Sequence, residues 1–136
     1  MDYIHLTTSS ALPDISALRP FKAVVIVEDA VTADRQASVS HWLVESGCLY
    51  LMAWGNDCST WCDAVALANR QAFDTHEIPD ASLVITTWHS DETLQETFWF
   101  SKHTAMHPCS RLENIVLLHL ASVGSEQELI AEYEAA

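Results

Sequence analysis

The sequence predicts an α/β fold, a small three-layer sandwich in which a mainly parallel sheet of four to five strands carries helices on both faces. Two observations lead to this prediction. Short apolar runs rich in β-branched residues alternate along the chain with longer segments of helical periodicity. The runs are continuous, as in Ala23 to Val27, which is typical of strands buried on both faces. Strands joined by helices require right-handed crossovers, and therefore pair in parallel.

The first half of the chain supplies an edge strand, two core strands and one helix. Residues 22–28 and 48–54 are predicted core strands, and residues 3–7 add an edge strand as the fifth of the sheet. Between the core strands, apolar residues at helical spacing predict a helix over residues 32–46. Gly47 follows directly and is a suitable helix stop.

Three helices in the second half are predicted from their N-terminal signals. Thr60 to Asp63 matches a capping box, which opens a helix to about residue 73. Ser90 is a favourable N-cap for a helix that Pro108 ends, and Ser125 to Glu128 is a second capping box that opens a C-terminal helix. The predicted strands between these helices cover residues 82–88 and 113–121.

Length and composition predict a single α/β domain over residues 1–136. A chain of 136 residues buries about two-thirds of the surface that its unfolded form exposes, so no metal or disulfide is needed for stability. No apolar run approaches the ~18 residues of a membrane span. Met1 to His5 also lacks the basic and apolar regions of a signal peptide. We therefore expect a cytoplasmic protein that does not bind a membrane.

The charge balance restricts the kind of partner. Six Lys and Arg residues against nineteen Asp and Glu residues give a formal net charge of −13. Nucleic acids and anionic lipids are bound through cationic neutralisation of phosphate, so neither is an expected partner. Opposite potentials accelerate association, and a strongly acidic small protein is suited to bind a basic protein quickly.

The cysteines and histidines form no strong metal motif. The four cysteines lack a CxxC pair, and we expect them to be reduced. Cys58 and Cys62 lie on one face of a predicted helix, where we expect them to be small buried hydrophobic residues. His103 and His107 are spaced to share a metal on one helix face, with Cys109 as a further ligand. Because Cys109 follows Pro108, we expect hydrogen-bonded or solvent-facing histidines, with no metal or cofactor bound.

Motifs for phosphate binding and for serine hydrolysis are missing. With glycines only at positions 47, 55 and 124, the chain contains neither GxGxxG nor GxxxxGK[ST]. It also lacks the GxSxG elbow. These absences exclude the usual dinucleotide, P-loop and α/β-hydrolase sites.

The segment Val24 to Asp29 resembles the first strand of response-regulator receiver domains, in which an acidic pair binds magnesium beside a phosphorylated aspartate. The remaining receiver residues are not present. Alignment of Leu83 to Thr87 with the receiver's third strand places threonine at the phospho-acceptor position, and no lysine follows the last strand at His119 to Ser122. Phosphorylation chemistry of the receiver type is therefore not expected.

Polar and aromatic residues gather where the predicted strands end. Carboxyl ends of parallel strands meet at one edge of the sheet, which is where open α/β sheets bind ligands. The candidate partner-binding residues at this edge are Glu28, Asp29, Trp54, Asp57, Trp88, His89, Asp91 and Glu92. In one interpretation, each Trp fills the core and each Asp caps a helix. In the other, the rings and carboxylates form a surface that accepts Arg from a partner.

An enzymatic alternative uses the same edge. His89 would act as a general base oriented by Asp57 or Glu28, with Cys58 as a nucleophile at a helix N-terminus. The spacing of these residues does not require that interpretation. A concave pocket with converging His and carboxylate groups would favour an enzyme or ligand sensor, whereas a flat acidic face would favour a protein partner.

The segment Thr86 to Glu92 and the acidic, compact chain resemble small acidic bacterial α/β proteins of uncharacterised families, some of which are immunity proteins. This resemblance implies a non-enzymatic protein that neutralises a basic toxin such as a nuclease. We therefore expect an immunity or antitoxin-like binding protein, with a small α/β enzyme or ligand-sensing domain as the alternative.

Overall fold

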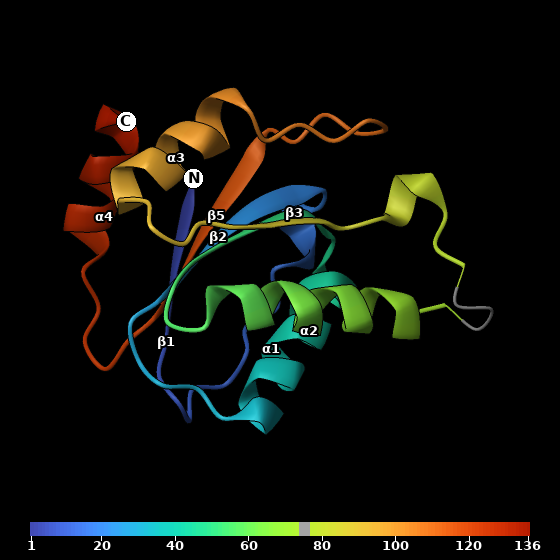
Figure 1. The fold of residues 1–136 in the computed structure, drawn as a ribbon, viewed down its shortest axis with the longest axis horizontal. Helices are drawn as coiled ribbons and strands as arrows, with labels where there is room; N and C mark the ends of the chain where they lie inside the picture. Colours follow the sequence, from blue (N-terminus) through green and yellow to red (C-terminus); the bar gives the residue numbers. More distant parts are fainter. Residues whose placement is uncertain (74–76) are drawn as a thin grey trace.

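A computed structural model describes residues 1–73 and 77–136 and confirms the α/β fold. Five strands form one sheet, in which all neighbours pair in parallel in the order β1-β5-β2-β3-β4 (Figure 1). The strands are β1 (Asp2–Leu6), β2 (Phe21–Val27), β3 (Cys48–Gly55), β4 (Ile85–Trp88) and β5 (Asn114–Leu120). The predicted edge strand is β1, which pairs with β5 although the two are far apart in sequence.

Helices cover both faces of the sheet, which gives the three predicted layers (Figure 1). Helices α1 (Ala33–Ser46) and α2 (Cys58–Gln71) pack on one face, against Ala23, Val25 and Val27 of β2. Helices α3 (Leu94–His103) and α4 (Glu126–Ala135) pack on the other, against Val24 and Ile26. None of the helices in the described residues is long and apolar enough to cross a membrane.

The structure confirms the boundaries of α1. Thr32 is the N-cap, and its hydroxyl accepts a hydrogen bond from the backbone N–H of Arg35. Gly47 ends the helix with φ 103°, a left-handed conformation that favours glycine. The buried strand β3 begins at the next residue, Cys48, so Gly47 alone separates the helix from the strand.

The N-termini of the other helices differ from the prediction. Helix α2 begins at Cys58, and the hydroxyl of Thr60 donates to the Asp57 carbonyl instead of capping the helix. Helix α3 begins after Thr93, whose capping box with Glu96 replaces the predicted start at Ser90. Ser125 does precede α4, but its side chain makes no capping hydrogen bond.

Two further boundaries are corrected. Strand β4 starts at Ile85, because residues Asp80–Ser82 form a short 3-10 helix. Helix α3 ends at His103, one turn before Pro108, so His103 and His107 do not share a helix face. Of the predicted loop at residues 74–81, residues 74–76 lie outside the described part of the chain.

The crossovers place a topological switch point between β2 and β5. After β2 the chain turns to the face covered by α1, whereas after β5 it turns to the face covered by α4. The carboxyl ends of these neighbouring strands therefore diverge, which is the position where open α/β sheets bind ligands. Glu28 and Asp29 directly follow β2 at this point.

The buried thiols and phenols predict a loss of stability at alkaline pH. Burial raises the pKa of Cys48 and of Cys62 from 9.0 to about 12, and it also raises the pKa of Tyr133 above 10.0. Above pH 9 the unfolded chain therefore binds fewer protons than the folded chain, and the free energy of unfolding falls as pH rises toward 12. Urea denaturation at a series of pH values should show this fall. A Cys48→Ala variant should show a shallower one, and an unchanged pH dependence in that variant would contradict the assignment.

Candidate functional site at the carboxyl edge of the sheet

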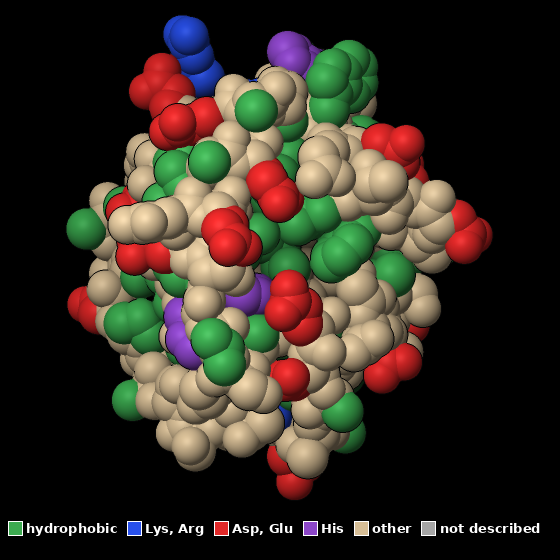
Figure 2. Space-filling view, turned by 90° about the vertical axis from the view of Figure 1, so that its left-hand side faces the viewer, with side chains coloured by type: hydrophobic (Ala, Val, Ile, Leu, Met, Phe, Trp, Pro, Cys, Tyr) green, Lys and Arg blue, Asp and Glu red, His purple; other side chains and the backbone are tan. Residues whose placement is uncertain are grey.

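The loops after β2, β3, β4 and β5 lie on the left in Figure 1, and this side faces the viewer in Figure 2. Carboxylates are spread over the face, whereas Lys and Arg side chains are visible only near its upper left and its lower rim. Histidine side chains appear left of its centre. The carboxyl edge thus combines carboxylates, histidines and apolar groups, as the sequence predicts.

His89 is held by a hydrogen-bond network at the end of β4. Its Nδ1 lies 2.5 Å from Glu92 Oε2, and its Nε2 lies 2.9 Å from the Thr87 hydroxyl oxygen. The Thr87 hydroxyl also lies near the phenol of Tyr50, and the ring of His89 packs against the ring of Phe100. The network therefore joins β3, β4 and the start of α3 in the order carboxylate, imidazole, hydroxyl and phenol.

Trp54 connects this network to β3. Its indole Nε1–H donates to the Glu92 carbonyl oxygen over 2.9 Å, and the ring packs against the core beneath α3 and α4. Glu92 is thus fixed through both its side chain and its backbone. Trp54 supports the position of Glu92 and is itself only half-buried.

A second network joins β1, β5 and β2 around His119. The backbone N–H of Ser125 donates to the phenol oxygen of Tyr3, which leaves the phenol hydrogen for His119 Nδ1 at 2.7 Å. The ring proton of His119 is then on Nε2, which lies 3.2 Å from Glu28 Oε1. That N–H makes no well-aligned hydrogen bond, although the His119 side chain is completely buried. Glu28 therefore faces the buried imidazole of His119.

The Tyr3 hydroxyl is predicted to be a stabilising group. In Tyr3→Phe, the buried Nδ1 of His119 and the N–H of Ser125 both lose their partner, which costs about 1 to 3 kcal/mol of unfolding free energy. Urea denaturation measures this difference. A His119→Phe change made in the Tyr3→Phe background should cost less than the same change in the wild-type chain. Strict additivity would show that the two side chains are not coupled.

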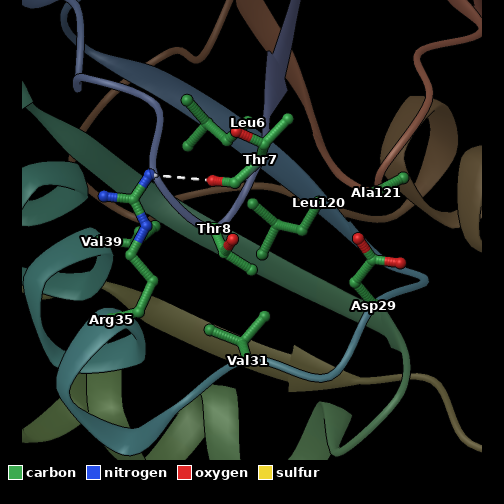
Figure 3. A pocket seen from close by; sticks show the side chains of 9 residues that line it. All are labelled: Leu6, Thr7, Thr8, Asp29, Val31, Arg35, Val39, Leu120 and Ala121. Atoms are coloured by element: carbon green, nitrogen blue, oxygen red, sulfur yellow. Dashed lines mark hydrogen bonds between the residues drawn. The ribbon is translucent and has the colours of Figure 1, made fainter.

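Asp29 lies beside a small cavity at the ends of β1, β5 and β2. One of its carboxylate oxygens accepts a hydrogen bond from the Ser122 hydroxyl. Figure 3 shows Asp29 and Arg35 on opposite sides of the cavity, with the Arg35 guanidinium bonded to the Thr7 carbonyl. The cavity measures about 10 Å³, which is the size of one water molecule. It has no room for a substrate.

Asp57 and Asp91 occupy strained turns of the edge. Both have positive φ, 53° and 62°, a conformation that Asp and Asn tolerate better than other residues with a side chain. Asp57 is the N-cap residue of α2 without a side-chain capping bond, and both residues are exposed. The prediction that Asp57 caps its helix through its side chain is therefore wrong.

Two exposed tryptophans flank the His89 network. Trp88 at the end of β4 is 56% exposed, so it does not fill the core. Trp99, which the sequence analysis did not select, is 54% exposed on α3. Together with Phe100 and the carboxylates of Glu92 and Glu96, Trp99 lines a hollow of about 350 Å³. This hollow combines two aromatic rings with two carboxylates.

The chain's own cations do not neutralise this edge. Four of the six Lys and Arg side chains donate to backbone carbonyl oxygens: Arg19, Lys22, Arg35 and Lys102. Between residues of the described ranges, the one ion pair of a Lys or Arg with a carboxylate joins Arg111 to Glu113 at 3.3 Å. That pair precedes β5, at the opposite edge of the sheet. The acidic charge of the carboxyl edge is therefore left for solvent or a partner.

The structure assigns His89 a different carboxylate partner from the one expected in the enzymatic alternative, and it buries the expected nucleophile, Cys58. His89 is oriented by Glu92 and not by Asp57 or Glu28. Cys58 is buried on the inner face of α2, together with Cys62 as predicted, and is therefore shielded from a substrate. The hydroxyl within reach of His89 belongs to Thr87.

The proposed metal ligands are also separated. His107 is buried and bonds the Leu83 carbonyl oxygen through Nε2, while its Nδ1 accepts from the Cys109 N–H. His103 packs against the ring of Trp99 in a tilted arrangement at the exposed end of α3. Within the described residues, no group of three or more His, Cys, Asp or Glu side chains is placed to hold a metal ion.

Comparison with known proteins identifies the family without supplying a function. Neither the curated proteins nor the solved structures contain a match to this chain. One family model matches over residues 1–136, and its description is "Domain of unknown function (DUF7684)". The chain therefore belongs to the DUF7684 family.

Proposed function

We propose that this chain is a non-enzymatic binding protein, of the immunity or antitoxin type, whose carboxyl edge covers a basic surface of a toxin such as a nuclease. One observation carries the proposal. Four of the six Lys and Arg side chains bond to backbone carbonyls, and the ion pair of Arg111 with Glu113 lies at the opposite edge, so these contacts do not neutralise the carboxylates of the carboxyl edge. An uncompensated field of this kind steers a cationic partner toward the edge and raises its association rate.

The hollow beside α3 suits a cationic side chain of that partner. The indole of Trp99 offers an aromatic face for a cation–π contact, and Phe100 adds a second ring. Glu92 and Glu96 supply carboxylate oxygens for Arg or Lys, and a bidentate Arg pair is the strongest form of this contact. A volume of about 350 Å³ accommodates one such side chain with its hydration.

The experiment is a biosensor titration of the purified chain against the protein products of neighbouring genes, with poly-L-lysine as a reference for non-specific attraction. A specific partner should bind at least about a hundredfold more tightly than poly-L-lysine at physiological salt, because shape complementarity adds to charge. Trp99→Ala should weaken the specific complex by roughly 2 kcal/mol. Leu67→Ala, which truncates an exposed apolar side chain on α2, is the matched control and should leave the affinity unchanged. Equal effects of the two variants would count against the α3 hollow.

A second candidate function rests on the order of groups in the His89 network. Glu92, His89 and the Thr87 hydroxyl form the sequence carboxylate, imidazole and hydroxyl that nucleophilic hydrolases use. In this role His89 would take the Thr87 proton while the hydroxyl oxygen attacks an ester carbonyl. The bond to the ester's alcohol or phenol would break, that group would leave with a proton, and water would then hydrolyse the acyl-threonine. The burial of His89 favours a structural role instead. Hydrolysis of p-nitrophenyl acetate that is lost in the isosteric Thr87→Val variant would support the enzyme.

A further inference from the structure

A wide hollow lies at the opposite edge of the sheet from the proposed toxin-binding surface. It measures about 670 Å³ and is formed where β2 and β5 begin, by the end of α3 and the loop that follows it. In Figure 1 this loop extends to the upper right, away from the carboxyl edge. Its lining residues are Lys22, Lys102, Ala105, Met106, His107, Pro108, Cys109, Ser110, Arg111 and Leu112.

The charge of this lining is opposite to that of the whole chain. Three of the chain's six Lys and Arg residues, Lys22, Lys102 and Arg111, belong to the ten lining residues, which contain no Asp or Glu. Ten residues are about a fourteenth of the chain, yet they contain half of its cations. Glu113, which pairs with Arg111 at 3.3 Å, is outside the lining. The hollow is thus a local positive region in an acidic protein.

Hydrogen bonds to the backbone hold the ammonium groups of Lys22 and Lys102 in place. Each group still has at least one N–H that these bonds do not use. Lys22 Nζ is bonded to the Ser101 carbonyl oxygen, which leaves two of its three N–H groups. Lys102 Nζ donates to the backbone oxygens of Glu134 and Ala136 over 3.0 and 3.1 Å, which leaves one N–H group. Burial lowers the pKa of Lys22, a penalty on its charged form that a nearby anion would relieve. The donors are therefore pre-oriented before a ligand arrives.

The loop that closes the hollow is also fixed. The imidazole of buried His107 bonds the Leu83 carbonyl oxygen at 2.8 Å through Nε2 and accepts the Cys109 N–H at 3.1 Å through Nδ1. This arrangement ties the loop to the segment before β4. Small-molecule sites are usually preformed hollows of about 300 to 1,000 Å³ with an apolar lining and a few convergent polar groups. Ala105, Met106, Pro108 and Leu112 supply the apolar part here.

We propose that this hollow binds a small organic oxyanion, a phosphate ester or a carboxylate with an apolar body, through Lys22, Lys102 and Arg111. This site is independent of the proposed toxin-binding edge, because its residues and its charge are different. The oxyanion accepts hydrogen bonds from the free N–H groups of the two lysines and the Arg111 guanidinium. The apolar body of the ligand packs on the side chains of the loop.

Cys109 provides a direct reporter of occupancy. It is exposed in the lining, whereas Cys48, Cys58 and Cys62 are buried; the structure describes all four cysteines. A ligand in the hollow should therefore slow alkylation of Cys109 by iodoacetamide, followed by mass spectrometry of the full chain. The probes are inorganic phosphate, benzoate and AMP, each also titrated by calorimetry at low ionic strength. AMP tests for a phosphate ester and benzoate for a carboxylate with an apolar body.

At least one of AMP and benzoate should bind, protect Cys109 and exceed inorganic phosphate in affinity, because the loop offers apolar contacts. Lys22→Gln and Lys102→Gln should each weaken binding at least about tenfold and remove the protection. Arg70→Gln removes the same charge from the exposed end of α2 and should change affinity by less than about twofold. If Lys22→Gln does not fold, Lys102→Gln and Arg111→Gln carry the test. Absence of heat and protection with all three probes, or an equal loss in Arg70→Gln, would overturn the proposal.

Discussion

Replacing Asp57 and Asp91 by Asn and Glu96 by Gln should weaken binding of the basic partner by roughly 2 to 5 kcal/mol, if these carboxylates meet desolvated cations. The fold should be retained. Asn tolerates the positive φ of both Asp positions, and Gln preserves the capping box that Thr93 forms with residue 96. Affinity is measured by biosensor, and the unfolding midpoint by thermal denaturation. We refer to this triple substitution as the edge variant.

The matched control removes three charges from the rest of the surface. Asp80→Asn, Glu113→Gln and Glu134→Gln change the net charge by the same amount, but these exposed residues precede β4 and β5 or end α4. This remote variant should lose only the small, long-range part of the attraction, well under about 1 kcal/mol at physiological salt. Equal losses in the two variants would mean that net charge alone, and not the carboxyl edge, attracts the partner.

Gly55→Ala should cause a large loss of stability, larger than that of Gly124→Ala. Gly55 ends β3 with φ 102°, and a Cβ built there would lie 2.2 Å from the Val27 carbonyl oxygen. That oxygen also accepts the Asn56 N–H, so it is not free to move. We expect a loss of at least about 2 kcal/mol of unfolding free energy, because backbone strain and the displacement of β2 add together. Urea denaturation provides the measurement.

Gly124→Ala is the appropriate comparison. A Cβ at this position would meet only the side chains of His5 and Tyr3, at 3.2 Å, and φ there lies outside the left-handed range. The cost should therefore be smaller than that of Gly55→Ala. If the order of the two variants were reversed, the tight approach of the β3 turn to β2 would not be the source of strain.

Local signals explain why the architecture could be predicted from the sequence. The runs that became β2, β3 and β5 are apolar on both faces, which only a sheet covered on both sides can bury. Gly47 marked the end of α1 because a left-handed C-cap needs glycine. Strand order could not be predicted, since β1 pairs with β5 through contacts between residues more than a hundred positions apart.

Helix starts were harder to predict because several residues compete for each N-cap. Ser90, Asp91 and Thr93 all favour that position, and the tertiary structure selects Thr93. Asp91 adopts positive φ and His89 turns into the core, which delays the helix by one turn. At α2 the N-cap is Asp57, whose backbone is left-handed, so the helix begins two residues before Thr60.

At the edge itself, the sequence correctly predicted which strand ends carry polar residues but not which of them pair. The contact of His89 with Glu92 spans three residues and could have been considered from sequence spacing. The contact of Tyr3 with His119 could not, because β1 and β5 become neighbours only in the folded sheet. Trp99 was missed although its apolar neighbour Phe98 is fully buried in the core, which implies an exposed ring one position later on the helix.

The association rate constant tests the central claim most directly, measured for the chain and its partner over a series of ionic strengths. If the carboxyl edge steers a basic partner, the wild-type rate constant should fall roughly tenfold or more from low to physiological salt, while the dissociation rate constant changes little. The edge variant should show a much shallower salt dependence, and the remote variant should keep most of the wild-type slope. A wild-type association rate that does not depend on salt, or an edge variant with the wild-type slope, would contradict the account.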